Sequence, residues 1–323
     1  MGKKIRQAFV LGAGLGTRLR PLTETVPKPM IPLWNRPLLT WAFDHLIADA
    51  GTEAFMVNTH HCPEVYDDIF PDRRWRGASL DFRHEPTLLV TAGGIANVAD
   101  WLPSGDESFF VYNGDILTDL PLAPAIEAHE NSGALVTMVL RSEGAALQVA
   151  WDEQSGRVAD IRQATGRGGD LPRFQFTGIY LVRPAFLEWL TPGKIESVIL
   201  PFLEVIRQTD GIGGVVIDEG EWSDLGNRET YLDASVALAR RTAFPRYGRE
   251  DDASRIHPSA QIASTAIVDE ATSVGEGAVI ESGAEVRESI LWPGCRVGVG
   301  SRLSRCVVRS GRFATGEVEG VDF

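Results

Sequence analysis

Cysteine, long apolar runs and positive charge are scarce in this sequence, and each shortage narrows the possible functions. The 323 residues include three cysteines without close pairing, which indicates reduced thiols and a cytoplasmic protein rather than a disulfide framework. No stretch approaches the roughly 18 apolar residues of a membrane-spanning helix. The apolar stretch at residues 8–11 is too short for a secretory leader and runs straight into glycines. We therefore expect neither a membrane segment nor a membrane partner.

Basic residues are outnumbered as well: 31 Lys and Arg stand against 44 Asp and Glu, a formal net charge of −13. This balance argues against nucleic acid as a partner, because binding to a phosphate backbone needs a basic face. Hydrophobic residues make up 44% and charged residues 23%, a globular composition that argues against disorder. An acidic chain of this kind leaves small anionic substrates, which would need local cations.

Short apolar runs alternate with helical patterns over the first part of the chain. A run at residues 5–11 has the character of a buried strand, and residues 38–50 carry apolar side chains at helical spacing. The alternation predicts an α/β fold with a mostly parallel, Rossmann-like sheet and helices on both faces. Ligands of such sheets bind at the carboxyl ends of strands, where Gly12 and Asn113 fall. Further strands are expected at residues 54–58, 109–112, 134–140, 178–182 and 214–217, and a further helix at 231–241.

A different pattern follows a polar segment at residues 242–254, which we interpret as a linker. Apolar residues then recur every six positions, the hexapeptide signature of a left-handed parallel β-helix. Trp292 holds the same phase, and Val297 and Leu303 continue it after a slip of one residue. The in-phase residues before them are Ile256, Ile262, Val268, Val274, Ile280 and Val286.

The predicted domains are therefore residues 1–241, the linker at 242–254 and a β-helix domain at 255–323. An open β-helix end needs covering, so we expect the tail to form a homo-oligomer. Cys295 and Cys306 fall inside the repeat and are expected to fill its core.

The most informative motif is LGAGLGTRLRPLTETVPKPMIPLWNRP at residues 11–37. Its glycines follow the first expected strand and let bare backbone N–H groups approach phosphate oxygens. Glycine loops of this kind also serve dinucleotide enzymes and tight turns, so the loop alone decides little. Thr17 stands where a dinucleotide-binding loop needs a third glycine, and the Walker spacing is absent.

Two cations accompany this loop. Arg18 follows the glycines directly, and Lys28 stands between two prolines that stiffen the backbone around it. Fixed positive charge suits transfer at phosphorus, where charge grows on phosphate oxygens and on departing pyrophosphate.

The segment resembles the signature of the sugar-phosphate nucleotidylyltransferase family, Gly-x-Gly-x-Arg-Leu-x-Pro-Leu-Thr followed by Pro-Lys-Pro. Such enzymes join a nucleoside triphosphate to a sugar 1-phosphate and release pyrophosphate. The resemblance implies that residues 1–241 form a nucleotidylyltransferase catalytic domain, in which Arg18 assists departure of pyrophosphate and Lys28 holds phosphate. The loop residues placed against the nucleotide are Gly12, Ala13, Gly14, Gly16 and Thr17.

A second motif, VYNGD at residues 111–115, ends an apolar strand in a carboxylate. A bare Asn-Gly-Asp is most often only a turn, although a carboxylate at a strand tip also suits a hard cation such as Mg²⁺. The resemblance makes Asp115 the first metal ligand, and we place Asn113 with the nucleotide. The second ligand would be Asp224 in EWSDLGNRETY, which resembles the family's Trp-x-Asp-x-Gly element. Mg²⁺ bound there would bridge the triphosphate and the sugar phosphate and neutralise both.

Two further stretches match the family more loosely. TAGGI at residues 91–95 resembles its nucleotide-contacting loop, where backbone around Gly93 and Gly94 would meet base or ribose. FTGI resembles the strand whose glycine, here Gly178, lies against the sugar, and Glu196 matches a contact to a sugar hydroxyl. The residues alone fit ordinary loop glycines and a solvated carboxylate equally well.

The chain departs from the family where many members carry Glu-Lys-Pro, whose lysine grips the sugar phosphate. Gln163 and Ala164 stand in that register, so either Arg162 or Arg167 supplies the charge or the sugar binds differently. Members that use UTP and N-acetylmuramate 1-phosphate also lack a clear lysine at this position. They also have segments similar to VNTHH (residues 57–61), TAGGI and FTGI. Mannose-1-phosphate guanylyltransferases more often carry a β-helix tail. GTP and UTP both stay open, and the sugar stays unnamed.

Two other functions fit parts of the sequence. A non-catalytic regulatory or assembly subunit would match the tail, since some family members with such tails have lost activity. In this chain, however, all four charged residues assigned to catalysis are present: Arg18, Lys28, Asp115 and Asp224. An acyltransferase with His257 as its base would match the repeat, but the tail is short and has no obvious loop for an acyl-CoA arm. His60, His61 and Cys62 adjoin one another without a zinc-binding spacing and indicate an ordinary loop.

Overall fold

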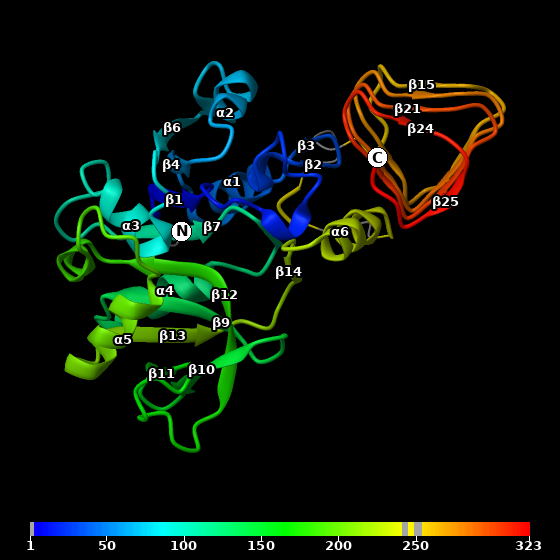
Figure 1. Ribbon diagram of the computed structural model, residues 1–323. Helices are drawn as coiled ribbons and strands as arrows, with labels where there is room; N and C mark the ends of the chain where they lie inside the picture. The colour runs from blue at the N-terminus through cyan, green and yellow to red at the C-terminus, as the bar shows by residue number, and fades with distance from the viewer. Residues whose placement is uncertain (1–2, 241–244, 249–253) are drawn as a thin grey trace. The chain divides into compact units, whose positions relative to one another are not determined.

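The computed structural model describes residues 3–240, 245–248 and 254–323 (Figure 1). The chain forms two compact units, each made of two stretches of sequence. Unit 1 comprises Met1–Leu15 and Ala42–Trp222, and unit 2 comprises Gly16–Trp41 and Ser223–Phe323. Arg241 and most of the expected linker at 242–254 lie outside the described residues, so the predicted domain boundaries stay a prediction. In the described part of the chain, no helix combines the length and apolar character needed to cross a lipid bilayer.

Unit 1 is built on a ten-stranded sheet with the order β10-β11-β13-β9-β12-β7-β1-β4-β6-β5. The strands predicted from apolar runs are confirmed, since each overlaps an observed strand. The sheet strands are β1 (Gln7–Leu11), β4 (Ala54–Thr59), β5 (Arg74–Trp75), β6 (Ala78–His84), β7 (Phe109–Asn113), β9 (Val136–Arg141), β10 (Leu147–Asp152), β11 (Arg157–Ile161), β12 (Arg173–Val182) and β13 (Ile212–Val216). A short strand, β8 (Ile116–Thr118), follows β7.

The sheet is mixed, and the expectation of a mostly parallel sheet is wrong for half of it. β1 runs parallel to β4 and β7, β4 to β6, and β13 to β9. β12 runs antiparallel to both β7 and β9, and β10 and β11 form an antiparallel pair. The reason is the length of the connections. Only residues 153–156 join β10 to β11, whereas a parallel pairing needs a crossover of roughly a dozen residues or more.

Helices cover both faces of this sheet, as the sequence predicts. Successive residues of a strand point to opposite faces. Met56 and Val111 face a core that includes side chains of α3 and α5. Phe55, one position away from Met56, faces the other side, where its ring centroid lies 4.5 Å from that of Phe43 in α1. The helices are α1 (Leu39–Ala50), α2 (Glu64–Ile69), α3 (Val90–Asn97), α4 (Ala123–Ser132), α5 (Ile199–Gln208) and the 3-10 helix η3 (Pro184–Trp189).

Unit 2 combines a short segment from the first part of the chain with its C-terminal part. Up to the start of α1 at Leu39, residues 16–38 have little regular structure apart from short 3-10 helices and a hairpin of two-residue strands. A helix then leads to the tail, in agreement with the prediction for residues 231–241 as far as the described residues reach. These elements are η1 (Thr17–Leu19), η2 (Lys28–Met30), β2 (Pro32–Leu33), β3 (Arg36–Pro37) and α6 (Arg228–Arg240); β14 (Trp222–Asp224) begins at the last residue of unit 1.

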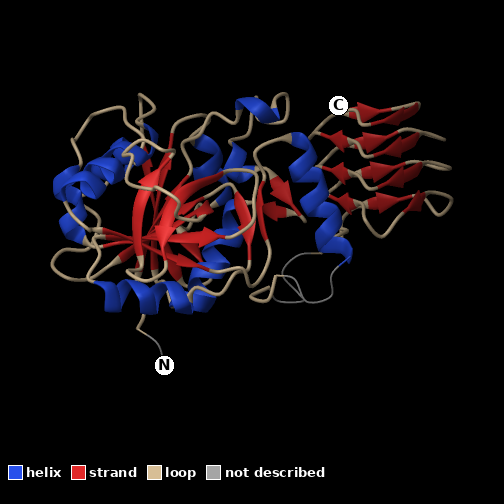
Figure 2. Cartoon of the chain, turned by 90° about the horizontal axis from the view of Figure 1, so that it is seen from below, coloured by secondary structure: helices blue, strands red, loops and turns tan. Residues whose placement is uncertain are grey.

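The tail strands form three parallel sheets, in which every third strand pairs with the next of its sheet. Figure 2 shows these strands stacked in rows. The chain therefore visits each sheet once per turn of a coil. The strands are β15 (Gln261–Ile262), β16 (Ile267–Val268), β17 (Ser273–Val274), β18 (Val279–Ile280), β19 (Glu285–Arg287), β20 (Ile290–Leu291), β21 (Arg296–Val297), β22 (Arg302–Ser304), β23 (Val307–Val308), β24 (Phe313–Ala314) and β25 (Glu317–Glu319).

The six-residue repeat supplies the core of the coil. Val274, Ile280 and Val286 are buried together there, and Cys295 and Cys306 fill space beside them, as predicted. The apolar residues of the repeat therefore mark the positions that face the core of the coil, one in each strand.

Trp292 does not hold the phase of the repeat, contrary to expectation. Leu291 takes the inward position, in register with Val274 of the coil before it and Val308 of the coil after it. The step from Val286 to Leu291 is five residues, one shorter than the repeat, so the slip occurs before position 292. Trp292 is buried outside the inward-facing row and donates its indole N–H to the hydroxyl of Tyr231 in α6.

Candidate active site

The carboxyl ends of β1, β4 and β7 meet in unit 1. Leu11 at the end of β1 is in register with Asn58 of β4 and Asn113 of β7. The next residue, Gly12, donates its N–H to Asn58 Oδ1 at 2.8 Å, and its carbonyl accepts the Tyr66 hydroxyl at 3.0 Å. A Cβ at position 12 would lie 2.7 Å from the Asn58 carbonyl oxygen, so only glycine fits. Gly12 therefore shapes the loop, and its own N–H is already bound.

The rest of the glycine loop passes from unit 1 into unit 2 between Leu15 and Gly16. Ala13 is buried, whereas Gly14 is exposed and a Cβ there would meet nothing within 4 Å. Gly16 has φ +60, which favours glycine, and Thr17 begins η1 as an exposed residue. Open backbone is thus found at Gly14 rather than at the start of the loop.

A buried Asn–Glu pair lies behind this loop. Asn58 Nδ2 donates to Glu85 Oε1 at 2.8 Å, and Glu85 Oε2 accepts the N–H of Leu89 at 2.9 Å. Both side chains are almost completely buried. Gly94 packs against the pair, because a Cβ there would lie 3.0 Å from Asn58 Nδ2 and 3.1 Å from Glu85 Oε1. Asn58 and Glu85 therefore link the glycine loop to the start of α3.

Sequence reasoning did not find Asn58 and Glu85. The signal available was positional: Asn58 lies near the end of a buried strand, and Glu85 follows β6 directly. A polar residue at the carboxyl end of a strand next to the glycine loop faces the region where ligands of α/β sheets bind.

Gly93 and Gly94 lie in helix α3 and not in the loop that the motif suggested. The N–H groups of Ala92 and Gly93 donate to the Glu196 carbonyl at 2.9 and 3.4 Å. A Cβ on Gly93 would lie 2.2 Å from the Lys194 carbonyl oxygen, so glycine permits the close approach of this segment. The Glu196 carboxylate is 11% exposed and pairs with Lys194. The structure thus brings Gly93 and Glu196 together.

Gly178 and Asn113, expected near the sugar and the nucleotide, are in contact. Gly178 has φ +83, and a Cβ there would lie 2.4 Å from Asn113 Nδ2. It occupies an irregular part of β12, where the register with β9 shifts between Phe176 and Tyr180. Asp115 lies two residues beyond Asn113, in the turn between β7 and β8, and is partly buried.

Three predicted residues converge in unit 2. Lys28 Nζ lies 3.5 Å from Asp224 Oδ1; the lysine side chain is 7% exposed and the aspartate side chain 45%. Arg18 reaches the same place, because a Cβ on Gly226 would lie 2.7 Å from Arg18 Nη2 and 3.0 Å from Asp224 Oδ1. Gly226 leaves the space in which a guanidinium and a carboxylate lie close together, and sequence reasoning did not single it out.

The two predicted metal ligands belong to different units, Asp115 to unit 1 and Asp224 to unit 2. Within the described ranges, no group of three or more His, Cys, Asp and Glu side chains is arranged to hold a metal ion. His60 donates its Nδ1–H to the Glu85 carbonyl oxygen at 2.7 Å, and Cys62 contacts His61. Burial and the nearby charge of Glu64 raise the pKa of the Cys62 thiol.

The two arginines considered in place of the family lysine have different surroundings. Arg167 donates through Nη1 to the Ile206 carbonyl and through Nη2 to the Arg207 carbonyl at 2.9 Å, both at the end of α5. Arg162 is exposed, and its Nε donates to Gln148 Oε1 at 2.9 Å. The guanidinium of Arg167 is therefore engaged in holding α5, whereas the hydrogen bond found for the Arg162 guanidinium among the described residues goes to the side chain of Gln148.

A family model for nucleotidyl transferases matches residues 7–241, which is more than half of the chain. The chain belongs to the nucleotidyl transferase family. The resemblance read from the glycine loop is thereby confirmed, and this nucleotidyltransferase is an enzyme of that class. All the site residues described above fall within the matched range.

Curated relatives extend the similarity into the tail. The chain is 31% identical to the mannose-1-phosphate guanylyltransferase of Mycobacterium tuberculosis over 306 residues, which covers 92% of this chain and 83% of the relative. It is 27% identical to the UTP–glucose-1-phosphate uridylyltransferase of Synechocystis over 259 residues, covering 73% of this chain and 64% of the relative. The first of these two matches spans more of the chain.

Solved structures support the fold. The UDP-glucose pyrophosphorylase from Acinetobacter baumannii aligns with a TM-score of 0.61 at 18% identity, covering 76% of this chain and 96% of that one. An inositol-1-phosphate CTP transferase from T. maritima aligns with a TM-score of 0.58 at 16% identity, covering 71% and 93%. At these identities the likeness concerns the α/β fold of the nucleotidyltransferases.

Proposed function

We propose that this nucleotidyltransferase joins a nucleoside triphosphate to a sugar 1-phosphate, giving a nucleotide sugar and pyrophosphate. The observation that carries the proposal is the convergence of Arg18, Lys28 and Asp224 around Gly226. Two cations held beside a carboxylate match what transfer at phosphorus requires, namely fixed positive charge where phosphate charge grows. The curated relatives named above act, by their names, on sugar 1-phosphates.

In this reaction an oxygen of the sugar phosphate attacks the α-phosphorus in line. The bond between the α-phosphorus and the bridging oxygen of pyrophosphate breaks, and pyrophosphate leaves with the electron pair. We assign Arg18 to the departing pyrophosphate and Lys28 to the phosphate oxygens. Lys28 is buried and held beside Asp224, so its ammonium group needs little reorganisation when charge develops.

The other predicted residues divide into backbone that meets the nucleotide and glycines that shape it. Gly14, Gly16 and Thr17 offer the open part of the loop, while Gly12 and Ala13 set its path. We place Gly93, Gly94 and Asn113 with the nucleotide, and Gly178 and Glu196 with the sugar. The contact between Gly93 and the Glu196 segment supports a pocket in which one segment serves both substrates.

We propose Asp115 and Asp224 as ligands of Mg²⁺. The donor set fits this ion, because Mg²⁺ prefers oxygen and is commonly held by one or two carboxylates together with substrate phosphates and water. A group of many protein ligands is not needed for such a site. When bound, Mg²⁺ would supply positive charge to the phosphates, while Arg18 and Lys28 hold and orient them.

We propose GTP and mannose 1-phosphate as the first substrate pair to test. The guanylyltransferase of M. tuberculosis is similar over 92% of this chain, tail included, whereas the uridylyltransferase match covers 73%. UTP with N-acetylmuramate 1-phosphate is the second pair, because the chain has Gln163 and Ala164 where a sugar-phosphate lysine is common. For this role of a lysine we propose Arg162, since Arg167 holds the end of α5.

The test is pyrophosphate release across five nucleoside triphosphates and the 1-phosphates of mannose, glucose and N-acetylmuramate, with and without Mg²⁺. Turnover of one pair that stops on removal of the metal supports the proposal. Binding of a nucleotide without turnover of any pair would instead favour a non-catalytic subunit and would overturn it.

Matched variants test the residues. Arg18→Ala and Asp115→Ala should each lower turnover by roughly 100-fold or more while leaving the thermal midpoint unchanged. Arg20→Ala and Asp106→Ala are the controls, because both side chains are exposed and neither is assigned to a substrate. Normal turnover of Arg18→Ala or Asp115→Ala would end the assignment of that residue.

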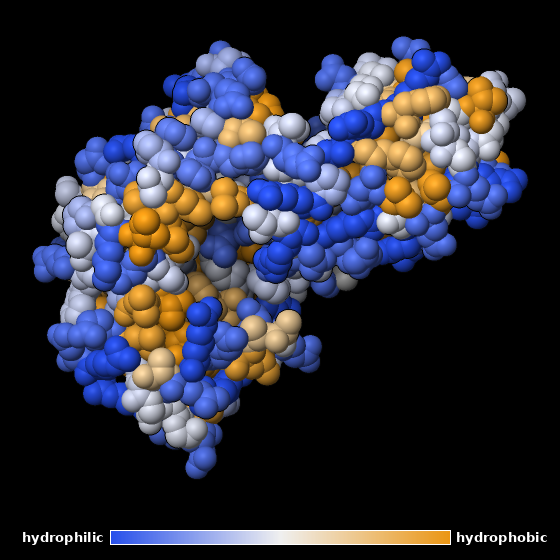
Figure 3. Space-filling model, viewed as in Figure 1, coloured by the Kyte–Doolittle hydropathy of each residue, from blue (hydrophilic) through white to orange (hydrophobic). Residues whose placement is uncertain are grey.

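We propose that the tail is a left-handed parallel β-helix that joins copies of this chain in the cytoplasm. Its three parallel sheets and hexapeptide core support the β-helix, whose hand a crystal structure would show directly. Ile267, Val299 and Phe313 are 54%, 74% and 56% exposed, and Figure 3 shows apolar patches on the tail. Light scattering at micromolar concentration should therefore find more than one chain per particle, and a monomer would contradict this assembly. Recovery of the protein in the membrane fraction of lysed cells would contradict the proposed cytoplasmic location.

A further inference from the structure

The loop that carries Arg18 and Lys28 has little structure of its own. Between Gly16 and Leu38, before helix α1, it forms two 3-10 helices of three residues and a hairpin of two-residue strands. Elements this short are not stable alone, so contacts with other parts of the chain must fix the loop. Among these are contacts from α6 and the tail, which lie in the same compact unit.

Arg309 of the tail holds the loop between its two cations. Its Nη1 donates to the Pro21 carbonyl at 3.0 Å and to Glu24 Oε2 at 3.1 Å. The same guanidinium is tied to the tail, because its Nε donates to the Phe323 carbonyl at 2.9 Å. Arg309 is 15% exposed. A planar guanidinium can hold these groups in fixed directions, which an ammonium group on a flexible stem cannot.

The loop is also fixed on the far side of Lys28. Asn35 Nδ2 donates to the carbonyls of Ser254 at 2.7 Å and Val274 at 2.9 Å, which belong to the start of the tail. Trp292 Nε1 donates to the Tyr231 hydroxyl at 3.1 Å, and that hydroxyl donates to the Pro32 carbonyl. This explains why Trp292 leaves the phase of the repeat: its indole connects the coil to α6 and, through Tyr231, to the loop.

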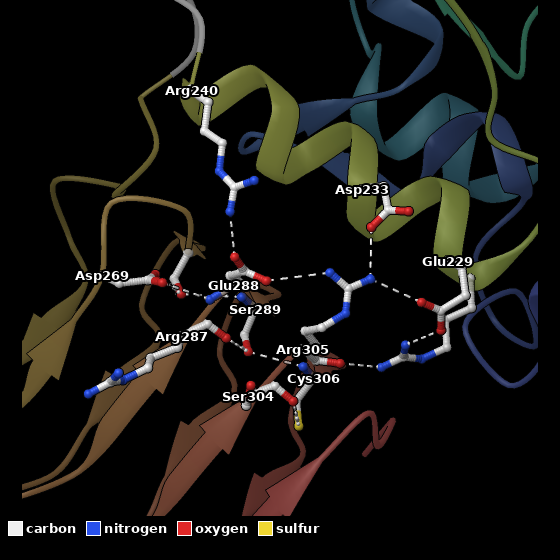
Figure 4. Close-up of polar contacts among 12 residues, drawn as sticks. Glu229, Asp233, Arg240, Asp269, Arg287, Glu288, Ser289, Ser304, Arg305 and Cys306 are labelled. Atoms are coloured by element: carbon white, nitrogen blue, oxygen red, sulfur yellow. Dashed lines mark hydrogen bonds and ion pairs between the residues drawn. The ribbon is translucent and has the colours of Figure 1, made fainter.

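The Asp224 side of the cluster is tied to the tail as well. Helix α6 begins four residues after Asp224, and Arg305 of the tail lies between two of its carboxylates and one of the tail (Figure 4). Arg305 lies 2.7 Å from Asp233, 3.1 Å from Glu229 and 3.4 Å from Glu288. Both segments of the charged cluster, the loop with Arg18 and Lys28 and the segment with Asp224, are therefore anchored to the coil, directly or through α6.

We propose that the tail is a positioning part of the phosphate site, and that Arg309 is its main positioning residue. The inference rests on the proposed function, because it assumes that Arg18 and Lys28 meet phosphate. Arg309 touches no substrate; it holds Pro21 and Glu24 so that the guanidinium and the ammonium reach the reacting phosphates at the correct distance. Displacement of such groups by about 1 Å can reduce a rate by on the order of 100-fold.

The experiment compares Arg309→Ala with Arg312→Ala in the full chain. Arg312 lies on the same coil and is exposed, and no side-chain hydrogen bond or ion pair is found for it among the described residues, so it controls for loss of one charge. Arg309→Ala should lower kcat roughly 10- to 100-fold, leave the KM of the sugar 1-phosphate within about two-fold, and keep the thermal midpoint close to that of Arg312→Ala. Arg309→Lys keeps the positive charge but lacks the planar guanidinium. If the alanine variant does not fold, the lysine variant should still show the lower kcat with a nearly unchanged KM.

A double variant separates positioning from general support of the fold. If Arg309 acts through the cations, the double variant Lys28→Ala/Arg309→Ala should lose much less kcat than the product of the losses in the two single variants. Unchanged kcat in both Arg309 variants would overturn the inference, and so would losses that multiply in full. High activity of Lys28→Ala alone would instead overturn the proposed function, which keeps the two failures distinct.

Discussion

At the scale of residues, Gly226 provides the space in which the charged groups of Arg18 and Asp224 lie close together. Arg18 and Lys28 lie on one loop and Asp224 on another segment; the ends of Arg18 and Asp224 meet where Gly226 has no Cβ, and Lys28 lies beside Asp224. In the proposed site these groups must reach phosphates, and a side chain at position 226 would occupy the space between the guanidinium and the carboxylate. The glycine provides this room without adding an atom that competes for the cations.

Gly226→Ala should therefore reduce activity more than stability. The new methyl group would lie 2.7 Å from Arg18 Nη2 and 3.0 Å from Asp224 Oδ1, and both are the far ends of side chains that can rotate away. We expect kcat to fall by roughly 10-fold or more, with a change of less than about 1 kcal/mol in the free energy of unfolding. Steady-state kinetics and urea unfolding measure the two quantities. A large loss of stability with normal kcat in the folded fraction would show that the glycine serves the fold alone.

At the scale of elements, a buried histidine connects helix α4 to the sheet of unit 1. His129 of α4 is completely buried, with Nδ1 2.8 Å from Thr137 Oγ1 and Nε2 3.0 Å from Ser108 Oγ. The pKa of His129 is lowered to about 4, chiefly by burial; the nearby charge of Arg183 acts in the same direction, Glu130 opposes it, and Lys3 adds to the lowering. The helix is thus attached to the sheet by a neutral imidazole.

Acid should weaken this attachment in a defined pH range. An unfolded histidine binds its proton near pH 6.5, whereas His129 in the folded chain does so only near pH 4. The contribution of His129 is therefore complete above about pH 6.5 and is lost as the pH falls toward 4, by up to on the order of 3 kcal/mol. Urea unfolding of the parent and of His129→Gln between pH 7 and 4.5 measures this. The parent should lose more stability than the variant; equal losses would contradict a buried neutral His129.

The elements themselves were largely predictable from residue patterns, and the exceptions have physical causes. Apolar runs placed β1, β4, β7, β9 and β13 because buried strands leave a local signal. The direction of β12 left none, since strand direction is set by connection length and pairing across the sheet. The repeat predicted the tail core, but one short turn moved Leu291 inward and turned Trp292 toward α6.

The candidate site divides in the same way. Arg18 and Lys28 were found because the glycine-loop motif is long and specific, and Asp224 because EWSDLGNRETY resembles a family element. The structure brings the three together. Asn58 and Glu85 were missed because their function depends on neighbours that only the folded sheet supplies. Sequence spacing also could not show that Gly93 lies in a helix and gives room for the Lys194 carbonyl.

At the scale of the whole molecule, the chain is divided inside its most informative motif. The glycine loop leaves unit 1 after Leu15, and the stretch with both cations packs with α6 and the tail. Patterns along the chain predict domains that follow one another, because composition changes near residue 250. Compact packing follows contacts instead, and these place a segment from the start of the chain with its end. We therefore propose that the tail positions the cations in addition to its proposed role in assembly.

The most direct test of the central claim is a crystal structure of the enzyme with Mg²⁺ and its nucleotide sugar. The account predicts a carboxylate oxygen of both Asp115 and Asp224 at about 2.1 Å from the metal, with Lys28 on a phosphate oxygen. A metal and phosphates bound by other side chains, with Arg18, Lys28, Asp115 and Asp224 all directed elsewhere, would contradict it.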